Sequence, residues 1–591
     1  SGPGEDDQAD ALVISPASHF MVASMIGDGH QKIASGFNGK LRNLPAGFEQ
    51  QTLLAFGHGI NATWNLWGKT LTGLENVQRP SNQADALLKY LGYWTDNGAY
   101  YYYNYDTNLG YAGTLQALVK QYRREQIPIR YLQLDSWWYE KSLMGPDRKI
   151  GKPKAPGLPQ GEWNRYGGLL KYEADPFLFP QGLAAFQKSV GLPLATHNRW
   201  IDLNSPYRQK YKISGVAAVD PKWWSDIADY LQSSGVVTYE QDWCDRIYKY
   251  SPAFSRSVDT GEDFLNDMAY ACRQRGIKLQ YCMAYPCYFL QGSRYENLTT
   301  IRVSNDRFEP SKWHDFLYVS RLASALGIWP WTDVFFSDET NNLLLSTLSA
   351  GPVGIGDELG RENKANLLRA VRADGVIVKP DAPIVPLDQS YLAEARHEPT
   401  PLLVGTFTEH GSIKTEYLFA FNHSGDNREI QIAPAEFGFS NSVCLYDYFS
   451  GEIKKLDAGT IFSAGLSAGK TAFYLVAPMS QSGIAFLGDK DKFVSTGKQR
   501  IAFIQDEPGR LTVKVIFAAN EKSVTLHGYA ATAPEISVQS GEAQPLNFDK
   551  TTGHFSVEIN PDLSAPAADI DGDPARLVTV QFQTISAGHK L

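Results

Sequence analysis

The chain has 591 residues, of which 43% are hydrophobic and 12% aromatic, and its formal net charge is -9 at pH 7. This length and apolar content predict a globular protein with a large core and several domains. The acidic balance and the lack of a Lys/Arg-rich stripe argue against nucleic acid as a partner, because phosphate backbones are bound by clustered basic side chains.

No run of about eighteen apolar residues is present, so no membrane span is expected. The N-terminal stretch SGPGEDDQAD lacks the basic start and apolar centre of a signal peptide and is typical of a processed terminus. Since a removed export signal leaves no trace, we favour a periplasmic or secreted location over the cytoplasm. The five cysteines follow no CxxC spacing and HExxH is absent, so we expect neither a metal nor another cofactor.

Residues 1–88 contain short apolar runs such as ALVISP and TLLAFGHG, which predict a β-rich N-terminal segment. From residue 89 to residue 378, short apolar strands alternate with polar loops and amphipathic helices. The helical pattern TLQALVKQYRREQ, for example, is followed by the compact strand IPIRYLQLD. The eight expected strands lie in LGYWTDNG, IPIRYLQLD, GLPLATHN, GVVTYEQD, GIKLQYC, TTIRVSND, GIWPWTD and GPVGIGD.

This alternation predicts an α/β fold, a (β/α)8 TIM barrel over residues 89–378, although other α/β folds with eight strands are compatible with the same pattern. After residue 378 the helical periodicity fades. Short β-rich runs such as EYLFAFNH and TAFYLVAP predict a β-sandwich over residues 379–482. Runs such as LTVKVIFAA and LVTVQFQ predict a second β-sandwich-like domain over residues 483–591.

In a TIM barrel the site lies at the C-terminal ends of the strands. Polar and aromatic side chains collect at these positions along the whole predicted barrel. In chain order they are Trp94, Asp96, Asn97, Asp135, His197, Asn198, Arg199, Asp202, Glu240, Asp242, Asp245, Tyr281, Tyr285, Arg302, Asn305, Asp306, Asp333 and Asp357.

Carboxylates and indoles without metal-ligand spacing suit the cleavage of glycosidic bonds. Aromatic faces stack on the CH surfaces of a sugar, and carboxylates accept hydrogen bonds from its hydroxyls. The reaction needs one ionised and one protonated carboxyl group, and we select Asp242 and Asp306, which end the fourth and sixth strands. Capping of a following turn is the alternative role for each. Glu240 shares a face with Asp242 but lies further from the strand end.

Five motifs resemble those of the raffinose synthase and alkaline α-galactosidase group in clan D of the glycoside hydrolases. RVSNDRFEP is similar to its Arg-x-Ser-Asp-Asp-Phe-x-Pro, with Asn305 in place of the first aspartate and Arg307 inserted. PWTDVFFS and LSAGPVGIGD are similar to Pro-Asp-Trp-Asp-Met-Phe-x-Ser and Ser-Gly-Gly-Pro-x-Tyr-x-Ser-Asp. IRYLQLDSWW resembles the strand ending Asp-Asp-Gly-Trp, and GVVTYEQDW the nucleophile strand Gly-Val-x-x-x-Lys-x-Asp. The matches keep their order over most of residues 90–360.

The resemblance implies a retaining α-glycosidase that acts on α-galactoside-like glycans, with Asp242 as nucleophile and Asp306 as acid/base. The two carboxyl groups of such enzymes lie about 5 to 5.5 Å apart, and the reaction passes through a covalent glycosyl-enzyme. Asp306 must then carry a proton before the reaction, which a partly enclosed and negatively charged site would favour by raising its pKa.

Two departures from the family pattern concern the sugar. Ser136 replaces the second aspartate after the second strand, and Glu240 replaces the usual lysine. We therefore expect a modified galactose, such as an anhydro, sulfated or N-acetylated form, or another sugar. His197 and Arg199 offer donors for an anionic or acetylated group, while a salt bridge at the barrel rim is the alternative role of Arg199.

The remaining expected substrate contacts have structural alternatives as well. Asp135 is the first choice for a hydroxyl acceptor, with helix capping as its alternative. Arg302 is expected to orient the acid/base or contact the sugar, or else to form a structural ion pair, and Asp333 matches a family position. Stacking on sugar or packing in the core is expected for Trp94, Trp137, Trp243 and Trp331.

Two further functions fit the same residues. One is a transglycosylase of the raffinose-synthase type, in which a sugar replaces water as the acceptor. The other is an inactive carbohydrate-binding protein, although the presence of both Asp242 and Asp306 argues against it. An esterase of the α/β-hydrolase type is disfavoured because no GxSxG elbow precedes a suitable helix. The expected partner is an oligosaccharide or polysaccharide, and the sequence does not determine the oligomeric state.

Overall fold

The computed structural model describes residues 10–142 and 165–584. The N-terminal stretch considered above lies, apart from Asp10, outside the described residues. The chain forms two compact units, one of residues 1–342 and 351–363 and the other of residues 343–350 and 364–591. The four-part division drawn from the sequence stays a prediction.

The first unit contains an eight-stranded sheet in which every pair of neighbouring strands is parallel. A parallel bridge between Phe335 and Ile355 joins the segment after the seventh strand to the eighth and closes the sheet into a barrel. The TIM barrel predicted from the sequence is thereby confirmed. Its strands are β5 (Gly92–Trp94), β6 (Tyr131–Leu134), β9 (Leu194–Asn198), β12 (Val236–Gln241), β13 (Lys278–Tyr281), β14 (Leu298–Arg302), β15 (Trp329–Trp331) and β16 (Gly354–Ile355).

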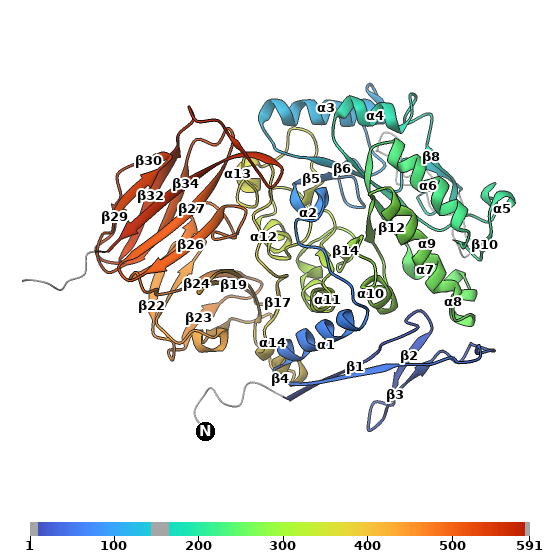
Figure 1. Cartoon of the computed structure of the whole chain (residues 1–591), viewed down its shortest axis with the longest axis horizontal. Coiled ribbons are helices and arrows are strands. Elements are labelled where there is room, and N and C mark those ends of the chain that lie inside the picture. Colours follow the sequence, from blue (N-terminus) through green and yellow to red (C-terminus); the bar gives the residue numbers. More distant parts are fainter. Residues whose placement is uncertain (1–9, 143–164, 585–591) are drawn as a thin grey trace, which may run out of the picture. The chain divides into compact units, whose positions relative to one another are not determined.

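Helices surround these strands (Figure 1). In α6 (Pro221–Ser233) the side chain of Asp220 accepts a hydrogen bond from the backbone N–H of Lys222, and Pro221 starts the helix, as N-terminal capping favours. Its buried residues Trp223, Ile227 and Leu231 follow the helical period. The other helices of this part are α3 (Gly110–Glu125), α4 (Leu183–Val190), α5 (Tyr207–Lys210), α7 (Cys244–Tyr250), α8 (Ala253–Arg256), α9 (Thr260–Gln274), α10 (Pro286–Gly292) and α11 (Trp313–Ala325). Helix α12 (Thr340–Leu348) begins in the first unit, and its residues from 343 onward belong to the second.

Two glycines allow aromatic rings to pack where the barrel closes. Gly354 of β16 pairs with Gly92 of β5. A Cβ atom on Gly354 would lie 2.0 Å from Cε2 of Trp94, and one on Gly92 would lie 2.2 Å from Cζ of Tyr131. The Trp94 Nε1–H donates to the Tyr131 hydroxyl at 2.8 Å. The two rings therefore fill the space that side chains on this strand pair would need.

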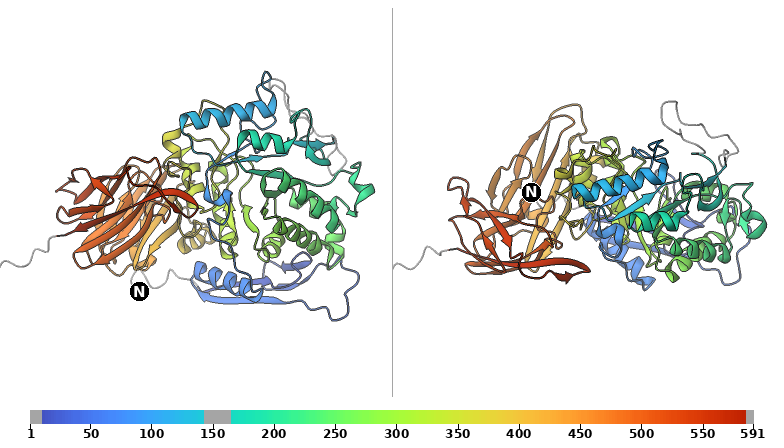
Figure 2. Two further views of the ribbon diagram at one scale, coloured as in Figure 1. Left: turned by 45° about the horizontal axis from the view of Figure 1, so that its top comes forward. Right: turned by 90° about the horizontal axis from the view of Figure 1, so that it is seen from above.

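The N-terminal segment packs against the outside of the barrel. Strand β1 (Asp10–Pro16) pairs with β4 (Thr52–His58), and β2 (Ala23–Gly27) pairs with β3 (Ile33–Phe37). Figure 2 shows α1 (Ile60–Leu74) beside these strands, and α1 also contacts α11. Further short elements of the first unit are α2 (Ala86–Lys89), the antiparallel pairs β7 (Tyr139–Lys141) with β8 (Leu169–Ala174) and β10 (Ile213–Ser214) with β11 (Ala217–Ala218), and a 3-10 turn (Pro310–Lys312).

The second unit is mainly antiparallel, as predicted for β-sandwiches. One core lies among β17 (Val385–Pro386), β18 (Leu402–His410), β19 (Ile413–Phe421), β20 (Arg428–Ile432), β21 (Val443–Asp447), β22 (Ile453–Leu456), β23 (Phe462–Leu466) and β24 (Thr471–Pro478). The other lies among β25 (Ile484–Asp489), β26 (Ile501–Glu507), β27 (Arg510–Ala518), β28 (Val524–Ala530), β29 (Glu535–Gln539), β30 (Gly541–Ala543), β31 (Asn547–Phe548), β32 (His554–Pro561), β33 (Ala568–Ile570) and β34 (Asp573–Gln583). Helices α13 (Lys364–Leu367) and α14 (Asp388–Ala395) and a 3-10 turn (Pro434–Phe437) complete this unit. Within the described ranges, no helix is both long enough and apolar enough to cross a membrane.

Candidate active site

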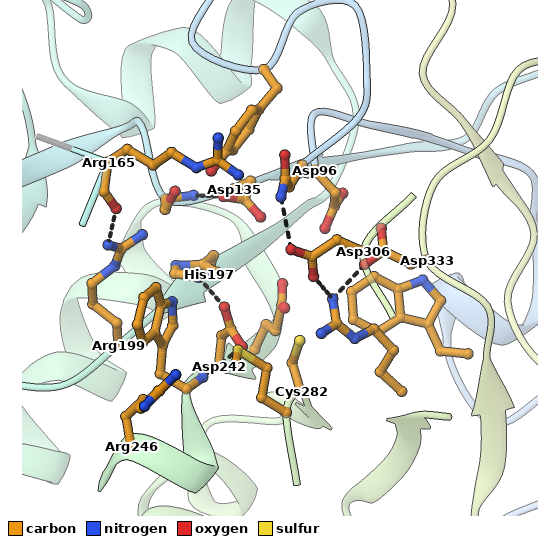
Figure 3. Close-up of a pocket in the computed structure, with 18 of the residues that line it drawn as sticks. Asp96, Asp135, Arg165, His197, Arg199, Asp242, Arg246, Cys282, Asp306 and Asp333 are labelled. Atoms are coloured by element: carbon orange, nitrogen blue, oxygen red, sulfur yellow. Dashed lines mark hydrogen bonds and ion pairs between the residues drawn. The ribbon is translucent and has the colours of Figure 1, made fainter. Parts of the chain in front are cut away.

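A pocket of about 240 Å³ lies at the C-terminal ends of the barrel strands (Figure 3). Its wall combines carboxylates, arginines and aromatic rings. We call this cavity the barrel pocket. It is lined by Asp96, Asn97, Tyr102, Asp135, Ser136, Arg165, Tyr166, His197, Arg199, Glu240, Asp242, Trp243, Arg246, Cys282, Met283, Arg302, Asp306, Trp331 and Asp333.

Asp242 follows the end of β12, and a short chain of hydrogen bonds holds its carboxylate. His197 Nε2 lies 3.0 Å from Asp242 Oδ2, and His197 Nδ1 lies 2.9 Å from the Tyr139 hydroxyl oxygen. Arg199 Nε–H donates to the same hydroxyl oxygen at 3.0 Å. Because the guanidinium only donates, the Tyr139 O–H is left to donate to Nδ1, so that Nε2 carries the proton that is donated to Asp242. The chain thus directs a donor at the carboxylate.

The charge of Asp242 is favoured by this arrangement. Burial raises the pKa of the carboxyl, but the hydrogen bond from His197, together with the charge of Arg302, outweighs burial and lowers the pKa to about 2. The backbone N–H of Trp243 adds a further hydrogen bond to Oδ1 at 2.5 Å. Asp242 is therefore an ionised carboxylate in the pocket wall, the state that a nucleophile requires.

Asp306 lies in a more open setting, beyond the end of β14. Its side chain is 48% exposed, whereas that of Asp242 is 12% exposed. Asn97 Nδ2 donates to Asp306 Oδ2 at 2.7 Å, and Arg302 Nη1 donates to Oδ1 at 2.6 Å (Figure 3). Asp306 therefore lies half-exposed at the mouth of the pocket, and its role as proton donor stays a prediction.

Arg302 also contacts Asp333, so one guanidinium nitrogen bridges two carboxyl groups. Arg302 Nη1 lies 2.5 Å from Asp333 Oδ2. Burial raises the pKa of Asp333 to about 7, with Asp306 adding to the rise and Arg302 opposing it. Asp333 is buried, and its backbone is in the left-handed region with a φ of 68°.

The base of the pocket is formed by polar side chains inside the barrel. Gln133 Nε2 donates to Asp96 Oδ1 at 2.9 Å and lies 3.4 Å from Glu240 Oε2. Burial raises the pKa of both carboxyls well above the usual range, and each receives a further rise from neighbouring carboxylates. These two groups therefore favour their neutral form, in which a carboxylic acid donates as well as accepts hydrogen bonds.

The structure brings most of the predicted site residues together. The expected contacts that line the barrel pocket are Asp135, His197, Arg199, Glu240, Asp242, Trp243, Arg302, Asp306, Trp331 and Asp333.

Trp94 and Trp137 are placed elsewhere, in the core. Trp94 is fully buried against Gly354, as described above. The ring of Trp137 stacks on Tyr111 with centroids 3.5 Å apart, and its Nε1–H donates to Thr95 Oγ1 at 2.8 Å. Packing and an internal hydrogen bond thus occupy both indoles, which matches the core-packing alternative given for them, and neither residue lines the barrel pocket.

Two of the lining residues, Arg199 and Asp135, form hydrogen bonds with the backbone. Arg199 donates to the backbone oxygens of Arg165 at 2.5 Å and Gly167 at 3.2 Å, and its guanidinium lies 5.3 Å from the Trp243 ring centroid. Instead of the salt bridge considered from the sequence, Arg199 therefore anchors backbone at the pocket wall. Asp135 accepts a hydrogen bond from the backbone N–H of Ser136, a local turn contact.

Several lining residues received no role in the sequence analysis. Arg165 precedes β8, within the excursion between β6 and β9, where no strand-end rule applies. Arg246 lies in α7 and Met283 follows β13. Met283 lies two residues beyond the end of β13 and Arg246 five residues beyond the end of β12, so the strand-end rule would have indicated them only if it were extended further along the loops. The described residues contain no group of three or more His, Cys, Asp or Glu side chains suited to a metal ion.

No family profile matches the sequence, and no curated protein matches it significantly. Among solved structures, a β-L-arabinopyranosidase of glycoside hydrolase family 27 from Geobacillus stearothermophilus is similar over 66% of this chain and 96% of its own, with 14% identity and a TM-score of 0.45. An α-galactosidase from Saccharomyces cerevisiae with raffinose is similar over 68% of this chain and 100% of its own, with 12% identity and a TM-score of 0.45. A putative α-galactosidase from Bacteroides fragilis is similar over 79% of this chain and 92% of its own, with 11% identity and a TM-score of 0.40.

Proposed function

We propose that the chain is a retaining glycoside hydrolase that acts on α-galactoside-like glycans. One observation supports this proposal above the others: two carboxyl groups of the barrel pocket have different surroundings. Asp242 is buried and accepts a hydrogen bond from His197, while Asp306 is half-exposed at the pocket mouth. Retaining glycosidases need such a pair, one carboxylate for attack and one carboxyl group for proton transfer.

In the first step, an oxygen of Asp242 attacks the anomeric carbon, and the bond from that carbon to the leaving oxygen breaks. Asp306 gives its proton to the leaving oxygen. In the second step, Asp306 takes a proton from water, whose oxygen attacks the same carbon and releases Asp242. The ionised state of Asp242, with its pKa lowered to about 2, supports its part in this sequence.

Asp306 must exchange its contact with Arg302 for a proton before it can act as the acid. Asp333 makes this exchange feasible, because Arg302 Nη1 keeps its contact with Asp333 when Asp306 is protonated. The Arg302 side chain, which is only 8% exposed, then does not lose its only carboxylate partner, a loss that is costly for a charge withdrawn from water. Arg302 and Asp333 thus serve as positioning residues for the proton donor.

The sugar in the pocket is proposed to be a modified galactose, such as an anhydro, sulfated or N-acetylated form. The support comes from Glu240 and Ser136, which replace the lysine and the aspartate of the family motifs. Because the pKa of Glu240 is raised well above its usual range, this side chain offers a neutral donor and acceptor where the family pattern has a cation.

The test compares wild type, Asp242→Asn and Asp306→Asn on α-galactosides, on oligosaccharides that carry anhydrogalactose, sulfate or N-acetylgalactosamine, and on α-glucosides. Product anomers are followed by NMR. We expect cleavage of an α-galactoside-like substrate with initial release of the α anomer, and loss of cleavage in Asp242→Asn. Initial release of the β anomer, or activity that survives in Asp242→Asn, would show that the proposed mechanism is wrong. Transfer to an added sugar in place of hydrolysis would indicate a transglycosylase.

A further inference from the structure

Arg307, the residue that follows Asp306, has an unusual backbone conformation that its side chain secures. Its φ is 55°, in the left-handed region that residues other than glycine rarely adopt. The guanidinium donates to both carboxylate oxygens of Glu339, from Nη1 to Oε2 at 2.8 Å and from Nη2 to Oε1 at 2.5 Å. Because such a bidentate pair fixes the orientation of both partners, it holds Arg307 in this conformation.

Glu339 connects this segment with two others. Its Oε2 accepts hydrogen bonds from the backbone N–H of Phe336, which lies beyond β15, at 2.9 Å and from Nδ2 of Asn342 in α12 at 3.1 Å. Cζ of Arg307 lies 4.4 Å from the centroid of the Phe336 ring. The segment that carries Asp306 is therefore tied to the segment after the next strand.

Arg307 also contacts the loop after β5. A Cβ atom on Gly98 would lie 2.7 Å from both Cβ and Cδ of Arg307, so glycine is needed for the two loops to approach this closely. The preceding residue, Asn97, donates from Nδ2 to Asp306 Oδ2 at 2.7 Å. Two successive residues of one loop thus contact two successive residues of the other, and the contact of Gly98 with Arg307 sets the position of Asn97.

The amide of Asn97 suits a group that changes its charge during the reaction. Its Nδ2 donates to ionised Asp306, and after rotation of the amide its Oδ1 accepts from the protonated form. Arginine and lysine, by contrast, only donate. The charged groups that face Asp306 are Arg302, whose Nη1 donates to Oδ1, Lys312, whose Nζ donates to the backbone oxygen at 2.9 Å, and Asp333, which shares Arg302 with Asp306. Asn97 can therefore bind both states of Asp306, provided that it stays in place.

We propose that a clamp holds the proton donor Asp306 against Asn97. The clamp consists of Arg307, Glu339 and Gly98. None of these three residues lines the barrel pocket, so they are positioning residues that act through the proton donor and its amide partner. Arg307 is the residue that RVSNDRFEP has in addition to the motif that it resembles. This inference rests on the proposed function and deepens it, because it assigns a function to that insertion.

The experiment uses two substrates, the oligosaccharide that wild type cleaves in the panel above and the α-fluoride of the same sugar. Fluoride leaves without full protonation, so cleavage of the α-fluoride depends little on the proton donor. In Arg307→Ala we expect kcat/KM for the oligosaccharide to fall by about 10 to 10², the effect of displacing a catalytic group by about 1 Å. The fall for the α-fluoride should be much smaller, whereas a general loss of structure would lower both values alike.

Further variants test the separate steps of this inference. Glu339→Gln removes the charge of the pair but keeps its shape, so it should show the same pattern with a smaller loss, even if Arg307→Ala fails to fold. If Arg307 acts through Asn97, the double variant Asn97→Ala/Arg307→Ala should cleave the oligosaccharide no more slowly than Arg307→Ala. Asn97→Ala alone completes this comparison. Arg273→Ala is the matched control, because it removes an exposed ion pair on α9 and should leave both kcat/KM values unchanged.

Equal losses on both substrates in Arg307→Ala or Glu339→Gln, or no loss on either substrate, would overturn the clamp while the proposed function stands. A double variant whose loss is the product of the two single losses would overturn it as well, because Arg307 and Asn97 would then act independently. If wild type cleaves no member of the panel, the proposed function is overturned, and this inference with it.

Discussion

His197 Nε2 lies 3.0 Å from Asp242 Oδ2, and the other ring nitrogen of His197 lies 2.9 Å from the Tyr139 hydroxyl oxygen. The histidine therefore has both nitrogens engaged, one with the proposed nucleophile and one with the residue that orients the ring. Such a second partner fixes the tautomer and the direction of the donated proton.

Replacement of His197 should change the acid limb of the pH profile. In His197→Phe the donor is lost while burial remains, so the pKa of Asp242 should rise from about 2. Because protonated Asp242 cannot attack, the acid limb of kcat/KM should move to higher pH. His197→Gln, which supplies an amide N–H, should move it less. The measurement is kcat/KM against pH for all three proteins, and identical acid limbs would contradict this role of His197.

Removal of the proton donor should affect substrates according to their leaving groups. In Asp306→Asn we expect kcat/KM for the oligosaccharide that wild type cleaves to fall by about 10² to 10⁴, the usual contribution of a general acid. The fall for the α-fluoride of the same sugar should be smaller, because fluoride leaves without full protonation. Asp229→Asn, at an exposed position on α6, is the matched control. Equal losses on both substrates would exclude Asp306 as the acid.

The buried carboxyl Asp333 should make stability depend on pH. Its pKa is about 7 in the folded protein against an ordinary value of 3.8, so the folded state binds more protons between these pH values. Its contribution to the free energy of unfolding is thus fully present below pH 3.8 and is lost as pH rises through about 7. Asp333→Asn should remove this contribution. Urea unfolding of wild type and Asp333→Asn between pH 3.8 and about 7 tests this prediction. If the free energy of unfolding changes with pH in the same way in both proteins, the prediction is wrong.

Replacement of Trp137 and replacement of Trp243 should have different effects, because Trp137 packs in the core and Trp243 lines the pocket. Trp137→Ala should lower the free energy of unfolding by about 3 to 5 kcal/mol, because it removes a ring stacked at 3.5 Å on Tyr111. Trp243→Ala, at a pocket position, should lower kcat/KM with a smaller loss of stability. Denaturant unfolding and steady-state kinetics on both variants provide the test. The assignment fails if Trp137→Ala is as stable as wild type.

The barrel and most of the pocket could be predicted from the sequence, because strands and helices alternate regularly and the pocket residues follow the C-terminal ends of the strands. Strands that run parallel place their C-terminal ends at one edge, so Asp242 and Asp306 meet although 64 positions separate them in the chain. The strand-end rule does not say whether a side chain near a strand end points into the pocket or between the strands and helices. Trp94 and Trp137 satisfy it and are nevertheless buried.

Contacts between loops that lie far apart in the sequence could not be predicted from the hydrophobic pattern. The amide of Asn97, which follows the first barrel strand, donates a hydrogen bond to Asp306, which follows the sixth. Tyr139 belongs to the short strand β7, whose pairing with β8 follows no periodic signal in the sequence. The hydrogen-bonded chain from Arg199 to Asp242 thus depends on a local excursion of the backbone that hydrophobic periodicity does not encode.

The packing of Trp94 over Gly354 has an evolutionary consequence. A Cβ atom at position 354 would lie 2.0 Å from the indole, so any larger residue there is incompatible with the ring in its present place. A smaller residue at position 94 would instead leave a void at the closure of the barrel, which is costly in a packed core. The two positions should therefore covary among homologues, with tryptophan at one accompanied by glycine at the other.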